Sequence, residues 1–153
     1  MDLILWRHAE AQEWNEGDDD MARALTARGY KQAKHIAAWL NRQLPEGARV
    51  LCSPARRCEQ TALALERKYK LRKELAPGAT ADALLAAADW PDGKSAVVLV
   101  GHQPALGQVI AQLAGMTQPS CTLRKGALWW LRTRERDGQT QTQVLTVQSP
   151  DML

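Results

Sequence analysis

The chain has 153 residues, of which 45% are hydrophobic and 24% are charged, and its formal net charge is +3. This length suits one ordinary domain with its own core, so we expect a single domain over residues 1–153. The small net charge, built from both signs, argues against disorder and against nucleic acid as a partner. No apolar run is long enough to span a membrane, and residues 1–7 do not resemble a signal peptide, so we expect a cytoplasmic protein with no membrane partner.

Three short apolar runs predict buried strands. They lie at residues 3–5, 50–52 and 97–100, and each is continuous rather than alternating. A strand covered on both faces has this pattern, which is typical of the central strands of a parallel sheet.

The segments that follow these runs show helical periodicity. Apolar residues recur at helical spacing over residues 30–44, with Tyr30 and Leu44 at the two ends of the stripe. A second helix is predicted to start after Pro54 and run to about Lys70, and a third to follow Pro104 and end before Gly115. Strands that alternate with helices indicate an α/β fold, here a three-layer α/β/α sandwich with a mostly parallel central sheet.

The last part of the chain predicts an antiparallel hairpin at the sheet edge. Two apolar segments, residues 128–131 and 144–147, lie on either side of the turn pair Asp137-Gly138. One of the neighbouring residues Trp129 and Trp130 should face the core, because side chains alternate along a strand.

Polar residues follow each of the three buried strands. Arg7 and His8 come after the first, Arg56 and Arg57 after the second, and His102 after the third. Ligands bind outside the carboxyl ends of parallel strands, so these side chains should meet at one edge of the sheet. Guanidinium groups match phosphate oxygens, and a neutral imidazole can attack phosphorus. The pattern therefore predicts phosphoryl chemistry.

Four motifs stand in a fixed order along the chain: LWRHAEA at residues 5–11, LTARG at 25–29, SPARRCEQT at 53–61 and VGH at 100–102. In this order and spacing the chain resembles the histidine phosphatase superfamily. Its short length and the RHAEA form of the first motif are most similar to the SixA-type phosphohistidine phosphatases. Ala9 stands where the superfamily usually has glycine.

The resemblance implies a metal-independent phosphatase that needs no cofactor. His8 would be the nucleophile and would carry a covalent phosphoryl group. Arg7 and Arg57 would bind the phosphoryl oxygens, and His102 would bind and donate to one of them as charge develops. Arg57 rather than Arg56 matches the spacing of the superfamily, because it is the fourth residue after Ser53.

A carboxylic acid that protonates the leaving group is missing from the pattern. Larger relatives supply one after the second helix, where this chain offers only Glu74 and Asp82, and neither matches well. The leaving group of a phosphohistidine can depart as neutral imidazole and depends less on such an acid. We therefore expect a phosphohistidine-bearing protein, such as a signalling domain, as substrate and partner. The alternatives are a phosphatase of small phosphate esters and a non-catalytic module that binds phosphate or phosphoproteins.

Other reactive residues receive no role. His35 falls on the charged face of the first helix, and the acidic run at residues 16–20 is expected to be a solvated loop. Cys52 lacks the arginine six positions later that a cysteine-based phosphatase requires, and the three histidines show no metal-binding spacing. Residues 117–124 have no predicted structure.

Overall fold

Six strands form one sheet in the order β3-β2-β4-β1-β5-β6 in a computed structural model that describes residues 1–153. The strands are β1 (Asp2–Arg7), β2 (Arg49–Cys52), β3 (Lys70–Leu71), β4 (Val97–Gly101), β5 (Leu128–Arg136) and β6 (Gln139–Gln148). The four strands from β3 to β1 run parallel, and β5 and β6 are antiparallel to their neighbours. The predicted mostly parallel sheet with an antiparallel edge hairpin is confirmed.

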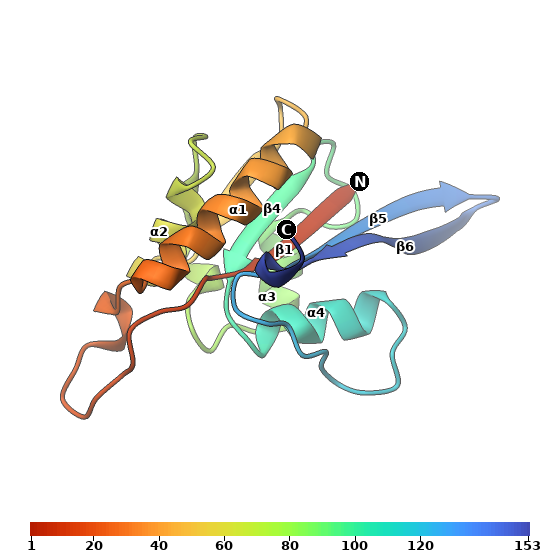
Figure 1. Cartoon of the computed structure of the whole chain (residues 1–153). Coiled ribbons are helices and arrows are strands. Elements are labelled where there is room, and N and C mark those ends of the chain that lie inside the picture. The colour runs from red at the N-terminus through yellow and green to blue at the C-terminus, as the bar shows by residue number, and fades with distance from the viewer.

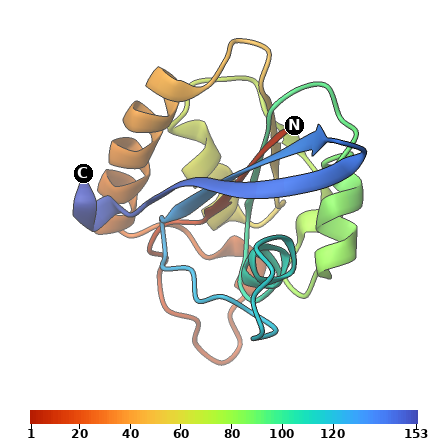
Figure 2. The same cartoon turned by 90° about the vertical axis from the view of Figure 1, so that its right-hand side faces the viewer.

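Helices cover both faces of this sheet (Figures 1 and 2). They are α1 (Ala27–Gln43), α2 (Arg56–Leu63), α3 (Ala81–Ala87) and α4 (Ala105–Leu113), with short 3-10 helices η1 (Asp20–Ala22), η2 (Lys73–Leu75) and η3 (Pro150–Met152). One core cluster joins the sheet to α1 and α2, and a second joins it to α3 and α4. This is the predicted three-layer sandwich. None of the helices is both long and apolar enough to cross a membrane.

The two-sided cover explains the continuous apolar runs. In β1, Leu3 and Leu5 pack in the cluster with α3 and α4, whereas Ile4 and Trp6 pack in the cluster with α1 and α2. All four side chains are fully buried. Since neither face of the central strands meets water, no position along them favours a polar residue.

Helix α1 begins three residues before the predicted stripe. Thr26 caps it, because its hydroxyl oxygen accepts a hydrogen bond from the backbone N–H of Gly29 (2.9 Å). The buried side of the helix includes Ile36 and Leu40, whereas Tyr30 is half exposed. Tyr30 was therefore wrongly placed on the apolar face, since the stripe starts one turn later in the helix.

The second predicted helix is too long. Helix α2 ends at Leu63, Glu66 adopts a left-handed backbone conformation (φ 54°), and Lys70–Leu71 pairs with β2 as β3. The reason lies in the sequence: the three residues after Leu65 are charged, and beyond Tyr69 no apolar side chain follows at helical spacing, so little would hold a further helical turn on the sheet. Helix α3 was not predicted, because its seven residues are too few for a recognisable period.

The C-terminal hairpin has the predicted turn. Asp137 and Gly138 both have positive φ (52° and 76°), as a tight turn between β5 and β6 requires. The hairpin projects beyond the body of the molecule (Figure 1). Trp130 is buried against α1 and Trp129 packs on the opposite face of the sheet, so the expectation that one of the pair faces the core is confirmed.

We expect Gly29→Ala to destabilise the protein. A Cβ at Gly29 would lie 2.0 Å from the carbonyl oxygen of Glu10, so the segment after β1 would have to move. Overpacking of this kind costs about 1–3 kcal/mol, more than the gain of up to about 1 kcal/mol from replacing glycine by alanine inside a helix. Gly47→Ala is the matched control, because a Cβ there meets nothing within 4 Å. Urea unfolding of both variants measures the difference, and an equal stability of the two would contradict this packing.

Candidate active site

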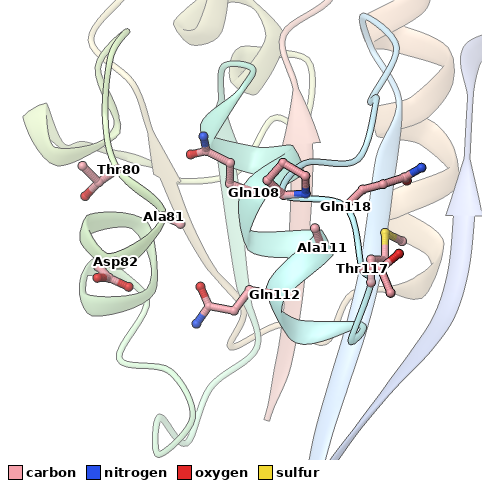
Figure 3. Close-up of a pocket in the computed structure, with 10 residues that line it drawn as sticks. Thr80, Ala81, Asp82, Gln108, Ala111, Gln112, Thr117 and Gln118 are labelled. Carbon is pink, nitrogen blue, oxygen red and sulfur yellow. The ribbon is translucent and has the colours of Figure 1, made fainter.

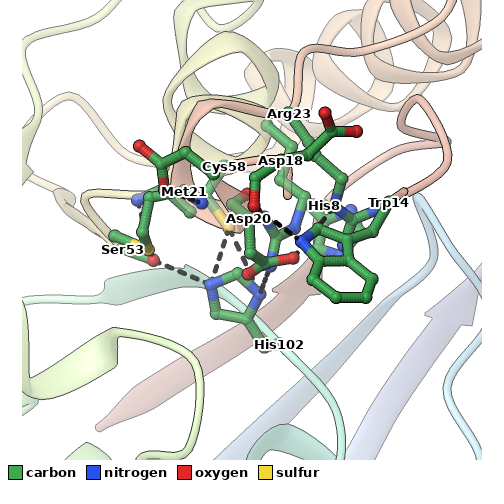
Figure 4. A network of polar contacts seen from close by, with 12 residues as sticks. His8, Trp14, Asp18, Asp20, Met21, Arg23, Ser53, Cys58 and His102 are labelled. Atoms are coloured by element: carbon green, nitrogen blue, oxygen red, sulfur yellow. Dashed lines mark hydrogen bonds and ion pairs between the residues drawn. The ribbon is translucent and has the colours of Figure 1, made fainter. Parts of the chain in front are cut away.

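The structure brings together the four predicted site residues at one edge of the sheet. His8 follows β1, Arg57 lies in the first turn of α2 after β2, and His102 follows β4. These strands are parallel neighbours, so their carboxyl ends share an edge. The rings of His8 and His102 have centroids 5.4 Å apart, and Nη2 of Arg57 lies 3.4 Å from Nδ1 of His102 (Figure 4). Arg7, the last residue of β1, adds a second guanidinium group.

His8 has one ring nitrogen fixed and one free. Its Nδ1 lies 2.8 Å from the carbonyl oxygen of Ala9, which can only accept, so Nδ1 carries the proton. In the neutral ring Nε2 then holds a lone pair and has no hydrogen bond within the protein. Burial lowers the pKa of His8 to about 3, and the charges of Arg57 and Arg7 lower it in the same direction. The imidazole is therefore neutral at any physiological pH.

His102 is neutral as well. Burial, followed by the positive charge of Arg57, lowers its pKa to about 4. Its Nε2 lies 2.8 Å from Oγ of Ser53, a fully buried hydroxyl that also accepts from the backbone N–H of Ala55. The thiol of Cys58 lies 3.4 Å from the same nitrogen. Burial raises the pKa of Cys58 to about 12, so the sulfur is a neutral neighbour.

The two arginines are only partly satisfied by the protein. Arg7 donates from Nη1 to the carbonyl oxygen of Leu123 (2.7 Å), and Arg57 donates from Nη1 to that of Asp20 (2.8 Å). Three buried side-chain nitrogen or oxygen atoms of the molecule lack a hydrogen-bond partner, and two of them are Nε of Arg7 and Nε of Arg57. Burial and the charge of Arg57 lower the pKa of Arg7, an arginine that still keeps its proton. Each of the two guanidinium groups therefore keeps a buried N–H donor without a partner in the protein.

Asp20 is the site residue that the sequence analysis missed. Its Oδ2 lies 3.2 Å from Nη2 of Arg57, and its Oδ1 accepts from Nε of Arg23 at 2.9 Å (Figure 4). Burial raises its pKa, but the hydrogen bond from Arg23 and the charge of Arg57 outweigh it, so the pKa stays below its ordinary value. Residues 16–19 are exposed as expected, whereas the expectation of a solvated loop is wrong for Asp20. No spacing rule marks a loop carboxylate that folds back onto a helix.

The two carboxylates considered as acids lie elsewhere. Glu74 is an exposed residue of η2 that pairs with Arg72 (3.0 Å). Asp82 is in the first turn of α3 and lines a surface pocket between α3 and α4 together with Gln108 and Gln112 (Figure 3). Neither has a hydrogen bond to the four site residues. His35 is exposed on α1, which agrees with its lack of an assigned role.

The unassigned segment 117–124 supports the site with its backbone. Leu123 supplies the carbonyl that holds Arg7, and the carbonyl of Cys121 accepts from the Gln103 side chain at 2.9 Å. Gln103 follows His102 directly and also accepts from Gly107 in α4. These contacts use main-chain atoms, so the residue types of the segment gave no indication of them.

Comparison with known proteins adds three findings. A family model described as "Histidine phosphatase superfamily (branch 1)" matches residues 3–80. The phosphohistidine phosphatase SixA of Escherichia coli K12 is 32% identical over 133 residues, which cover 80% of this chain and 80% of that protein. The structure of the protein histidine phosphatase SixA complexed with tungstate superposes with a TM-score of 0.82 at 25% identity, covering 99% of both chains.

The same fold also occurs in an enzyme for a small ester. A phosphoserine phosphatase from Entamoeba histolytica, solved in complex with phosphoserine, has a TM-score of 0.72 at 18% identity and covers 99% of this chain and 98% of its own. At this identity the likeness concerns the fold alone, which by itself does not fix the substrate.

We expect the protein to lose stability as the pH falls from 7 to 5. His8 and His102 have folded-state pKa values of about 3 and about 4, below the ordinary value of 6.5. The unfolded chain therefore binds protons first, so this stability is present above pH 6.5 and is lost below it. Protonation of each histidine in the unfolded chain should lower the free energy of unfolding by about 2 kcal/mol at pH 5. Urea unfolding at the two pH values measures the loss, and His8→Asn should remove about half of it. A slope that both His8→Asn and His102→Asn leave unchanged would contradict this assignment.

Proposed function

The chain belongs to the histidine phosphatase superfamily, and we propose that it is a metal-independent phosphohistidine phosphatase that acts through a phosphoryl group bound covalently to His8. The single observation that carries the proposal is a neutral, buried imidazole with a free Nε2 beside two arginines whose buried Nε atoms have no partner. A nucleophile and unused donors for a dianion meet at the same place.

The arginines supply the charge that a phosphoryl group needs. A phosphoryl group brings three oxygens with up to two negative charges, and a guanidinium group binds such oxygens with directed, charge-assisted hydrogen bonds. Arg7 and Arg57 thus take the part that a divalent cation plays in other phosphatases, where it stabilises charge on the transferring group. An unpaired buried donor costs free energy until an acceptor arrives, so the bound anion relieves that cost.

The reaction takes place in two displacements. In the first, Nε2 of His8 attacks phosphorus, a P–N bond forms, and the bond between phosphorus and the leaving group breaks. In the second, water attacks the phosphoryl group on His8, and orthophosphate and the free imidazole are formed. The proton stays on Nδ1 through both steps, donated in a hydrogen bond to the carbonyl oxygen of Ala9.

The hydrogen bond with Ser53 allows His102 to act as a hydrogen-bond donor to the phosphoryl group. In the free protein Nδ1 of His102 faces Arg57, which can only donate, so the ring proton lies on Nε2 and points to Ser53. A hydroxyl can donate as well as accept. When Arg57 turns to a phosphoryl oxygen, Ser53 can donate to Nε2, and the ring can then carry its proton on Nδ1 and donate to the same group. His102 and Ser53 exchange roles without adding a buried charge.

The carboxylates favour phosphohistidine as the substrate. Asp20 is the carboxylate within reach of the site, and its lowered pKa keeps it ionised, so it has no proton to give. An alkoxide leaving group needs such a proton, whereas a phosphohistidine protonated at its other ring nitrogen releases neutral imidazole. The similarity to SixA supports a protein as its carrier. A small phosphate ester remains the second candidate, supported by the fold shared with phosphoserine phosphatase.

We expect turnover to leave a phosphoryl group on His8. Rapid quenching with radiolabelled substrate should trap an adduct that is stable to base and labile to acid, as a phosphoramidate is. Because the arginines replace a cation in this proposal, labelling should persist after exhaustive chelation and should not rise on addition of magnesium, manganese or zinc.

His8→Ala should abolish the adduct and reduce turnover by several orders of magnitude, as loss of a nucleophile does. His35→Ala is the matched control, since His35 is an exposed histidine on α1. Label on a cysteine, or near-normal turnover of His8→Ala, would overturn the mechanism. Tight phosphate binding without any turnover would instead support a non-catalytic module.

We expect phosphohistidine and activated aryl phosphates to react much faster than alkyl phosphates. General acid catalysis contributes about 10²–10⁴-fold, so its absence should give a rate that depends steeply on the pKa of the leaving group. A series of aryl phosphates measures this slope. Glu74→Gln and Asp82→Asn should change little, because both residues lie outside the site. A flat dependence would favour small phosphate esters and a protonated acid in the site.

A further inference from the structure

Asp20 makes two contacts with the arginine that is proposed to bind phosphate. Its carbonyl oxygen accepts from Nη1 of Arg57 (2.8 Å), and its carboxylate oxygen Oδ2 lies 3.2 Å from Nη2. The Arg57 side chain is 4% exposed, whereas that of Asp20 is 42% exposed. The carboxylate therefore covers a deeply buried guanidinium group from the solvent side.

Neighbouring residues hold this carboxylate in place. Arg23 donates from Nε to Oδ1 of Asp20 (2.9 Å) and from Nη1 to the carbonyl oxygen of Gln12 (2.8 Å), so it ties together both ends of the loop. Within the loop, Nε1 of Trp14 donates to the carbonyl oxygen of Asp18 (3.0 Å). Trp14 and Asp18 are exposed, and this loop lies at the site in Figure 4. We call Asp20, together with its partners Arg23 and Arg57, the Asp20 latch.

A carboxylate and a phosphoryl group use Arg57 in the same way. Both offer anionic oxygens to the forked N–H groups, and both are bound through charge-assisted hydrogen bonds. Nη2 of Arg57 already faces the carboxylate on one side and Nδ1 of His102 on the other. A phosphoryl group that uses Nη2 must therefore displace one of these two contacts, and if the carboxylate of Asp20 stays close, the two anions repel one another.

We propose that Asp20 is a built-in competitor for the phosphoryl-binding arginine, which is displaced when a phosphorylated substrate binds and which weakens the binding of the product, orthophosphate. This rests on the proposed function, since it takes Arg57 as the phosphoryl ligand. A substrate adds contacts through the group that carries its phosphate, and these offset the loss of the Asp20 contact. Orthophosphate has no such contacts. The latch therefore selects against the product and favours its release.

Calorimetric titration with orthophosphate tests the latch on the whole chain without requiring turnover. Asp20→Asn keeps the shape of the side chain and removes its charge, so it should bind orthophosphate about two- to fivefold more tightly than the parent, the range expected for one partly exposed ion pair. Glu16→Gln is the matched control, because it removes the same charge from an exposed position of the same loop. Its affinity should equal that of the parent. Asp20→Ser should bind orthophosphate as tightly as Asp20→Asn. Agreement between the two variants shows that the effect comes from the lost charge and not from the introduced amide.

An affinity for orthophosphate that Asp20→Asn leaves unchanged or weakens would overturn the latch. If the unchanged affinity came with a selective loss of kcat for poor leaving groups, Asp20 would be a proton donor instead. Failure of the phosphatase proposal looks different: orthophosphate would still bind, and more tightly to Asp20→Asn, but no label would form on His8.

Discussion

Two guanidinium groups, that of Arg57 buried and that of Arg7 partly buried, meet at one corner of the sheet and are the constraint on which the site depends. Burial lowers the pKa of both neighbouring histidines most, and the charges of Arg57 and Arg7 lower it further. An imidazolium in this corner would be a third buried positive charge, so both rings stay neutral. In the proposed function, the positive charge that attracts the phosphoryl group therefore acts with burial to keep the attacking ring unprotonated.

Buried cations of this kind need compensation, and the fold supplies it mainly from loops. The carbonyl of Leu123 holds Arg7, and the carbonyl and carboxylate of Asp20 hold Arg57. Each bond leaves the Nε atom of its arginine unpaired. Carbonyl acceptors fix the orientation of a guanidinium without cancelling its charge, whereas the carboxylate of Asp20 cancels part of it. The two arginines are thus held differently, Arg7 by a dipole and Arg57 by a dipole and an ion, which is why a competitor is expected only at Arg57.

The parts of this arrangement that could be predicted are those that depend on periodicity. The buried runs located β1, β2 and β4, and the rule that ligands bind at the carboxyl ends of parallel strands placed His8 and His102 together with the pair Arg56-Arg57. Resemblance to a family then selected Arg57 and suggested roles for these residues. The remaining contacts could not be predicted, because Asp20 and Leu123 reach the site along irregular loops, where no spacing rule relates sequence to position. Helix α3 was missed because its seven residues give too little periodicity to recognise.

The hydrogen bond from Nδ1 of His8 to the carbonyl of Ala9 serves both proposed steps, because it keeps the ring proton on Nδ1. Before the attack it places the proton on Nδ1, so that Nε2 has the lone pair. After the attack the ring carries a proton on one nitrogen and phosphorus on the other. This is the form in which imidazole departs as a neutral molecule when water attacks, so no proton has to move on His8 in either step. The same chemistry describes the favoured substrate, since a phosphohistidine protonated at its second nitrogen also releases neutral imidazole. In the proposed function, such a site exchanges one P–N bond for another between two imidazoles, and a strong acid is not needed at any point of the cycle.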